Sequence, residues 1–271
     1  MYSFLDRSFA FHQQDDSSHK SIAPQWLESL PLVTEADDLA NYQGYFAYQQ
    51  VAGEDALSFF AQLDKQWVSI SVDLVGGQVA YRRQQGGGRK QHIAKACGLK
   101  SNRNPTVLDA TGGLGRDAAE LRNLGCELRV VERSPYVASL LQDAISRAQA
   151  NPETNQLFSQ GFELHHGQAI DLIEQLSAEQ QPDIIYLDPM FPPRNKSAAV
   201  KKEMRLVKRL VGEDPDADNL LPVALANAAK RVVVKRPSYA PYLNQQKPSM
   251  SIESKGNRFD VYLMTRFSNG N

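Results

Sequence analysis

A short acidic and proline-rich segment follows an apolar run and contains residue types that could do chemistry. The run Ile184–Leu187 ends at Asp188, and the chain continues with Pro189, Met190, Phe191 and two further prolines. Prolines restrict the backbone, so they would hold the Asp188 carboxylate and the Pro189 carbonyl in place before a substrate arrives. Phe191 offers a flat surface on which a nucleobase can stack, a contact worth about 1–3 kcal/mol. We predict that Asp188, Pro189 and Phe191 are catalytic residues that hold a planar amine; the alternative is a turn cap and a core aromatic.

A glycine-rich segment earlier in the chain is a second candidate site. The sequence VLDATGGLGRDAAE (107–120) predicts a buried strand, a tight turn and a helix. Gly113, Gly115 and Ala118 fit the G-x-G-x-x-G/A pattern of dinucleotide sites, in which backbone N–H groups at a helix start hold the ligand. The pattern alone is weak, because glycine turns before helices are common.

Acidic residues around this turn favour one class of ligand. Asp109 ends the predicted strand and would repel the pyrophosphate of a dinucleotide. An ammonium would instead be attracted by both Asp109 and Asp117. Glu132 ends the next predicted strand, where it can accept two hydrogen bonds from ribose hydroxyls; the alternative is a surface acid paired with Arg133. S-adenosylmethionine (SAM) carries an ammonium, a sulfonium, a ribose and an adenine, and these acids favour it as the cofactor.

The elements that position these residues alternate along the chain. The alternation predicts a doubly wound, Rossmann-like α/β sheet, closed at the end of the chain by an antiparallel hairpin that brings it to seven strands. The expected strands are 106–110, 127–132, 162–166, 183–187 and 231–235, the expected helices run from the glycine turn to about 123 and over 135–150, 169–176 and 220–230, and the hairpin strands are SMSIES (249–254) and RFDVYLMTRF (258–267). Ligands of such sheets bind at the carboxyl ends of the strands, so we expect Asp188 to face the glycine turn.

The first part of the chain departs from this alternation. The segment VSISVDL (68–74) alternates apolar and polar residues like a half-exposed strand. We therefore predict a small α+β region over residues 1–90 and a catalytic domain over 91–271. The first 20 or so residues are expected to be poorly ordered.

Composition excludes several classes of protein. A net charge of −1 over 271 residues and a pI near 6.5 exclude a globally basic nucleic-acid binder, so any such contact must use local patches. Cys97 and Cys126 form no CxxC pair, and the five histidines suggest no metal site. The sequence contains no signal peptide and no apolar stretch approaching a membrane span, so we expect a cytoplasmic protein.

Several segments together resemble a known family. Asp188–Phe191 matches the [D/N]-P-P-[Y/F] signature of methyltransferases that act on exocyclic amines, with Met190 in place of the second proline. This segment and five others are similar to the ribosomal RNA small subunit methyltransferase J (RsmJ) family, from about residue 70 to 266. The other five are VDLVGGQVAYRRQQGGGRK, LDATGGLGRDAAEL, SAAVKKEMRLVKRLVG, KRVVVKRPSYAP and KGNRFDVYL.

The resemblance implies a SAM-dependent methyltransferase that modifies N2 of a guanine near the 3′ end of bacterial 16S rRNA in the small ribosomal subunit. It also implies SAM contacts from the positions that match the family's own, which here are Arg116, Asp117, Glu132, Arg133 and Asp188. A family pair that is often Ser-Ser falls at Gln168 and Ala169. Gln168 can still bond adenine through its side chain, whereas Ala169 offers only its backbone.

Two basic stretches are candidates for contact with RNA phosphates. One would form a face of a helix soon after the catalytic segment, and the other a glycine-rich turn. The candidate residues are Lys201, Arg205 and Lys208 in the first stretch and Arg82, Arg83, Arg89 and Lys90 in the second. Lys235 and Arg236 would add charge at the same sheet edge as the catalytic segment. The alternative for each stretch is a solvated charged face.

Other functions remain open at this stage. A methyltransferase acting on another amine, such as adenine N6, would need the same motif. An NAD(P)-dependent oxidoreductase is favoured by the glycine pattern and Glu132 but disfavoured by Asp109. A ribosome-assembly factor without activity is disfavoured because Asp109, Glu132 and Asp188 are all present. Stabilisation by SAM but not by NADH would separate these possibilities.

Overall fold

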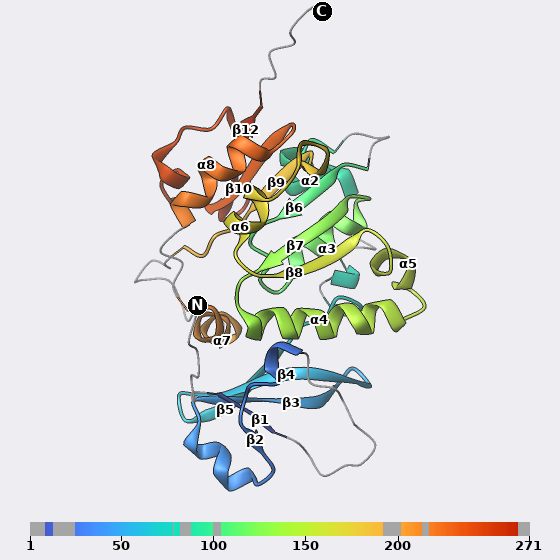
Figure 1. Ribbon diagram of the computed structural model, residues 1–271, viewed down its shortest axis with the longest axis vertical. Helices are drawn as coiled ribbons and strands as arrows, with labels where there is room; N and C mark the ends of the chain where they lie inside the picture. Colours follow the sequence, from blue (N-terminus) through green and yellow to red (C-terminus); the bar gives the residue numbers. More distant parts are fainter. Residues whose placement is uncertain are drawn as a thin grey trace, which may run out of the picture.

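The computed structural model describes residues 9–12, 25–77, 79–81, 88–99, 104–191, 202–212 and 217–264. Two β-sheets lie one above the other, with α4 (Pro135–Ala150) between them (Figure 1). The larger sheet positions the candidate site, and the smaller one covers the opposite side of α4.

The larger sheet has seven strands in the order β11-β12-β10-β9-β6-β7-β8. Its five parallel strands are β6 (Thr106–Asp109), β7 (Glu127–Glu132), β8 (Phe162–His166), β9 (Ile184–Leu187) and β10 (Arg231–Pro237). The antiparallel hairpin consists of β11 (Met250–Glu253) and β12 (Asn257–Leu263). The predicted mixed seven-stranded sheet is therefore confirmed, and β6 pairs with β9 at the point where the strand order reverses.

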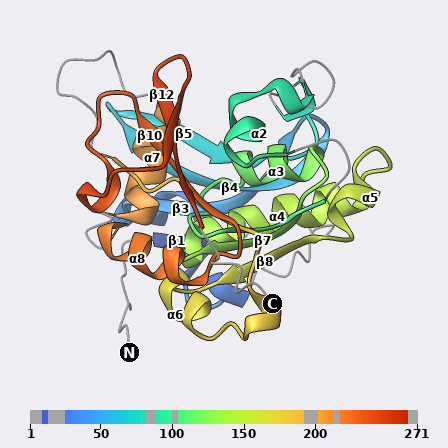
Figure 2. The ribbon, with the colours of Figure 1, turned by 90° about the horizontal axis from the view of Figure 1, so that it is seen from above.

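Helices cover both faces of this sheet because successive side chains of its buried strands point to opposite sides. Ile184 and Tyr186 pack in the core cluster that contains α4, whereas Ile185 and Leu187 pack in the cluster that contains α8. Figure 2 shows α6 and α8 on one side of the sheet and α3 on the other. The helices are α2 (His92–Ala96), α3 (Arg116–Asn123), α4, α5 (Asn155–Phe158), α6 (Ala169–Glu174), α7 (Lys202–Val211) and α8 (Ala217–Asn227).

Local signals placed most of these helices correctly. Ser134 caps α4 by accepting a hydrogen bond from the Val137 N–H at 3.4 Å, and Pro135 occupies the first turn. The helix predicted over 169–176 ends two residues earlier, at Glu174. The helix predicted over 220–230 instead runs from Ala217 to Asn227.

The smaller sheet has the order β2-β1-β3-β4-β5. Its strands are β1 (Phe9–His12), β2 (Leu32–Val33), β3 (Gly44–Val51), β4 (Glu54–Leu63) and β5 (Gln66–Ser71), and short 3-10 helices occupy Gln25–Leu27, Ala36–Asn41, Gly88–Lys90, Ala178–Gln180 and Leu243–Gln245. The expectation that residues 1–20 are poorly ordered is wrong for Phe9–His12, because this strand pairs with β2 and β3. The rest of that segment lies outside the described residues.

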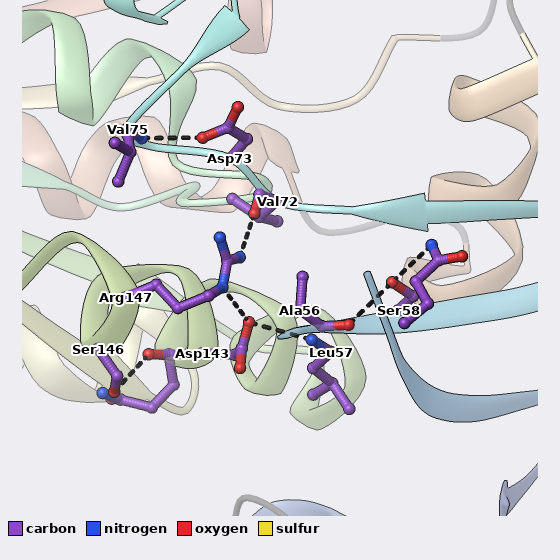
Figure 3. Close-up of polar contacts among 11 residues, drawn as sticks. Ala56, Leu57, Ser58, Val72, Asp73, Val75, Asp143, Ser146 and Arg147 are labelled. Atoms are coloured by element: carbon purple, nitrogen blue, oxygen red, sulfur yellow. Dashed lines mark hydrogen bonds and ion pairs between the residues drawn. The ribbon is translucent and has the colours of Figure 1, made fainter. Parts of the chain in front are cut away.

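A largely buried ion pair on α4 ties this helix to the smaller sheet (Figure 3). The Arg147 Nε atom lies 2.8 Å from Asp143 Oδ2, and its Nη2 donates to the Val72 carbonyl at 2.5 Å. The same carboxylate oxygen accepts a hydrogen bond from the Leu57 N–H of β4 at 3.2 Å. The predicted boundary at residue 90 remains a prediction, since one apolar cluster runs through both sheets.

Candidate active site

A cavity of about 480 Å³ lies at the carboxyl ends of β6, β7, β9 and β10. The sheet topology explains its place, because ligands of such folds bind where the strand order reverses. Its wall contains most of the residues predicted to bind the cofactor, namely Asp109, Gly113, Arg116, Asp117, Glu132, Arg133, Gln168, Ala169 and Asp188. Gly115 is not part of the wall, but belongs to the turn beside it as the N-cap of α3.

The turn between β6 and α3 requires glycine at two positions. A Cβ atom at Gly112 would lie 2.6 Å from Val130 Cγ1 on the neighbouring strand. Gly115 has a positive φ of 69° at the N-cap of α3, and a Cβ atom there would lie 2.6 Å from the Leu141 Cδ1 atom of α4. The turn therefore packs tightly on the sheet and on α4, so its geometry is set before a ligand binds.

Replacement of Gly115 by Ala is expected to lower the free energy of unfolding by about 2–4 kcal/mol, since backbone strain and overpacking add. Gly53 is a matched control, because its φ is +89° but nothing lies within 4 Å of its added Cβ atom. Gly53→Ala should cost only the strain, about 1–2 kcal/mol. Urea denaturation of both variants measures the difference, and equal costs would show that the Leu141 contact does not matter.

Glu132 ties the glycine turn to the next strand. Its Oε2 atom accepts a hydrogen bond from the Gly113 N–H and its Oε1 atom one from the Ser134 N–H, each at 2.7 Å. The side chain is 5% exposed, so it is not the surface acid that the alternative interpretation required. The side chain lines the cavity, where a carboxylate oxygen can accept a hydrogen bond from a ribose hydroxyl.

Asp109 is a buried acid at the end of β6. Burial raises its pKa to about 7, the N–H of Thr111 opposes the rise, and the neighbouring carboxylates of Asp117 and Asp188 add to it. The Thr111 N–H donates to Asp109 Oδ1 at 3.0 Å. The Thr111 hydroxyl in turn accepts the N–H of Asp188 at 2.6 Å, so the glycine turn and the catalytic segment are joined directly.

Lys235 and Tyr186 belong to the site, although sequence analysis did not place them in the cavity. The Lys235 Nζ atom lies 2.7 Å from Asp117 Oδ2 and 2.9 Å from Asp188 Oδ2. The Tyr186 hydroxyl donates to the same Asp117 oxygen at 2.7 Å. Lys235 lies at the sheet edge where its charge was expected, and its ammonium is held there by two carboxylates.

Phe191 lies beside the cavity and is held by two side chains of the segment that ends β10. The Arg236 Cζ atom lies 4.6 Å from the centre of the Phe191 ring. The Tyr239 ring meets Phe191 edge to face, with 5.9 Å between the ring centres. Arg236 is only 5% exposed, so its charge too faces the protein and not the solvent. This packing fixes the ring close to Asp188, three residues earlier in the chain.

The basic residues predicted to contact RNA are distributed unevenly. Arg82, Arg83 and Lys201 lie outside the described residues. Arg89 donates to the Leu124 carbonyl, just before β7, so the short helix that holds Arg89 and Lys90 lies near the amino ends of the strands, whereas the cavity lies at their carboxyl ends.

Helix α7 lies beside the cavity, and Met204, Val207 and Val211 contribute to the cavity wall. Its Lys208 is exposed, whereas Arg205 makes two hydrogen bonds to Asp64 of the smaller sheet's β4–β5 turn, at 2.6 and 3.1 Å.

Two properties of the described residues bear on the class of protein. No helix among them is long and apolar enough to cross a membrane. Within the same ranges, no three His, Cys, Asp or Glu side chains are grouped so that they could hold a metal ion.

Comparisons with known proteins agree with the geometry of the cavity. A family model described as "Putative SAM-dependent methyltransferase" matches residues 38–264. Ribosomal RNA small subunit methyltransferase J of Pseudoalteromonas atlantica is 49% identical over 246 residues, which are 87% of this chain and 95% of that protein. The protein of the same name from Aeromonas hydrophila is 58% identical over 196 residues, 72% of this chain and 78% of the relative.

A solved structure extends the match to the fold. The crystal structure of a SAM-dependent methyltransferase from Neisseria gonorrhoeae superimposes with a TM-score of 0.69 at 36% identity, and covers 94% of this chain and 96% of that one. The resemblance found in the sequence is confirmed, and the chain belongs to the ribosomal RNA small subunit methyltransferase J family of SAM-dependent methyltransferases.

Proposed function

We propose that this chain, acting in the bacterial cytoplasm, methylates N2 of one guanine near the 3′ end of 16S rRNA in the small ribosomal subunit. The observation that most strongly supports this function is that Asp188 lines the same cavity as the glycine turn and Glu132. The names of the relatives support ribosomal RNA of the small subunit as the substrate. The guanine N2 atom and its place in the RNA rest on the family resemblance.

The residues of the cavity fit SAM. The carboxylates of Asp109 and Asp117 suit its ammonium, and the Glu132 oxygens suit its ribose. Gln168 and Ala169 begin α6 at the wall of the cavity, where the Gln168 amide can bond adenine. When bound, SAM supplies an electrophilic methyl group on a sulfonium that leaves readily.

Asp188 and Pro189 act on the amine of the substrate. The lone pair of an exocyclic amine is delocalised into the base, so the amine is a poor nucleophile. A carboxylate oxygen of Asp188 and the Pro189 carbonyl accept its N–H bonds and favour a tetrahedral nitrogen. Phe191 stacks on the flipped base and holds it in place. The amine loses its proton after attack, so no strong base is required.

SAM affinity is expected to rise about tenfold between pH 6 and pH 8 and to level off above that. The pKa of Asp109 is near 7 without ligand, so below that value an incoming ammonium must displace a proton from the carboxyl group. Isothermal titration calorimetry across this range measures the dependence. Asp109→Asn should bind more weakly with a flat profile; an unchanged slope in this variant would place the titrating group elsewhere.

Small subunits from a strain that lacks the gene test the proposal. They are incubated with the protein and radiolabelled SAM, and the label is mapped on the RNA. Label at N2 of a single guanine near the 3′ end is expected. Label at adenine N6 would identify the alternative amine, and no label despite SAM binding would mean that the substrate is wrong.

Protein-free 16S rRNA is assayed in parallel, and we expect it to be the poorer substrate because the near-neutral chain lacks a globally basic surface.

A further inference from the structure

Strand register places a lysine beside the catalytic carboxylate. Strands β9 and β10 are parallel neighbours, and Val234 pairs with Leu187. Lys235 and Asp188 are the next residues on the two strands, so they emerge together at the floor of the cavity. A lysine at the end of a buried strand is uncommon unless it has a partner, because desolvation of its charge is costly.

The ammonium of Lys235 has two anchors on different elements. It lies 2.9 Å from Asp188 Oδ2 and 2.7 Å from Asp117 Oδ2, and the Asp117 side chain comes from α3. The fully buried Tyr186 donates to the same Asp117 oxygen at 2.7 Å. The side chains of Lys235 and Asp117 are only 22% and 17% exposed, whereas that of Asp188 is 40% exposed. Asp117 therefore holds the lysine on its buried side, and Asp188 is the most exposed of the three side chains.

This arrangement leaves one oxygen of the catalytic carboxylate for the substrate. Oδ2 of Asp188 is bonded to Lys235, and the described part of the chain offers no hydrogen-bond partner to Oδ1. A carboxylate pinned at one oxygen has lost most of its rotational freedom, which is the preorganisation that an acceptor needs.

We infer that Lys235 is a positioning residue for methyl transfer: it fixes Asp188 through Oδ2 and keeps this carboxylate charged, so that Oδ1 accepts the N–H of the target amine. The inference rests on the proposed function, since it assumes an amine as the acceptor of the methyl group. If the inference is correct, the acceptor site needs Lys235 as well as the Asp188–Phe191 motif, although the lysine lies 47 residues after Asp188 in the chain.

The charges around Asp188 support this role. Asp117 from α3 and Asp109 from β6 repel its negative charge, whereas Lys235 and Arg236 from β10 attract it. Burial raises the pKa of Asp188, and the ammonium of Lys235 is the largest influence opposing that rise. Burial lowers the pKa of Lys235 itself, but the two carboxylates more than offset this, so the lysine stays charged. Without the lysine, Asp188 would therefore protonate at a higher pH.

The test is the pH profile of kcat/KM for methyl transfer in Lys235→Met and Lys235→Gln, which lose the charge, and in Lys235→Arg, which keeps it. In the neutral variants, the acid limb of the kcat/KM profile is expected to shift to higher pH by about one pH unit or more. Below this limb, their kcat/KM should be about tenfold or more lower than that of the wild type, and the difference should narrow at high pH. Lys235→Arg should keep the wild-type profile even if its rate falls. Lys230→Met is the matched control, because Lys230 pairs with Asp183 at 2.6 Å just before the same strand and is half exposed.

A second readout does not depend on the substrate. The Asp188 carboxyl carbon is followed by ¹³C NMR in aspartate-labelled protein, with Asp188→Asn providing the assignment, and its pKa should be higher in the neutral variants. A uniform loss of activity at all pH values with an unchanged Asp188 titration would overturn the inference. Failure of the wild type to methylate guanine N2 would instead contradict the proposed function, whatever the titration shows.

Discussion

Asp188→Ala is expected to lower kcat for methyl transfer by about 100- to 1,000-fold, the range seen when one preorganised hydrogen-bonding group is removed from a catalytic site. The variant loses the acceptor that draws the amine toward a nucleophilic geometry. It should keep its fold, because Lys235 retains its bond to Asp117. SAM affinity should fall far less than kcat, because Glu132 and the glycine turn are untouched. Single-turnover assays on small subunits measure the rate, and calorimetry measures the affinity.

The matched control for this experiment is Asp183→Ala. Asp183 precedes β9 as Asp188 follows it, and its partner is the exposed ammonium of Lys230. Its loss should leave methyl transfer near the wild-type rate, since an exposed pair contributes little. If Asp188→Ala retained most of the wild-type kcat, the acceptor role would be untenable. If both variants lost activity equally, the effect would lie in the strand and not in the chemistry.

Glu132→Gln is expected to weaken SAM binding by about 5- to 150-fold, equivalent to about 1–3 kcal/mol for a buried hydrogen-bonding group left without its partner. Both carboxylate oxygens accept backbone N–H groups at 2.7 Å. The amide of glutamine replaces one oxygen with a donor, which then faces another donor, either at Gly113 or at Ser134. The glycine turn loses a fixed point, and the ribose loses an acceptor. Calorimetry with SAM measures the loss.

Glu127→Gln serves as its control, because Glu127 is exposed and begins the same strand, at the end opposite Glu132 and the cavity. It should bind SAM like the wild type. Melting temperatures of both variants should be recorded without ligand, where Glu132→Gln is expected to be the less stable. Unchanged SAM affinity in Glu132→Gln would mean that Glu132 only supports the turn and does not contact the cofactor.

The sequence was sufficient to predict those parts of the site that depend on local signals. The glycines, the acids at strand ends and the proline segment each follow a strand that can be recognised locally. Because the carboxyl ends of these parallel strands meet, Asp109, Glu132 and Asp188 line one cavity. Lys235 was placed at the correct edge, but its contact with Asp188 was not predicted. Its partner could be recognised only from the register of β9 and β10, which side-chain patterns do not fix when β9 is buried throughout and β10 is largely buried.

Two further features also depend on tertiary contacts. Arg89 belongs to a basic stretch for which contact with RNA remains a prediction, and its bond to the Leu124 carbonyl places it near the amino ends of the strands, away from the cavity. Phe9 lies in the segment that was expected to be poorly ordered, but its ring packs edge to face on Tyr136 of α4, with 5.0 Å between the ring centres. Local sequence patterns reveal neither contact, because each contact joins segments that are distant in the chain.

The place of α4 between the two sheets also has a consequence for synthesis. The hydrogen bond from Leu57 to Asp143 spans 86 residues, so the strands of the smaller sheet leave the ribosome well before the helix that covers them. Phe46 and Phe59 are fully buried in the finished protein, and Phe46 stacks on Tyr136 of α4, so their burial is incomplete until α4 emerges. A nascent chain stopped before residue 135 should therefore expose an aromatic surface on the smaller sheet and recruit chaperones there.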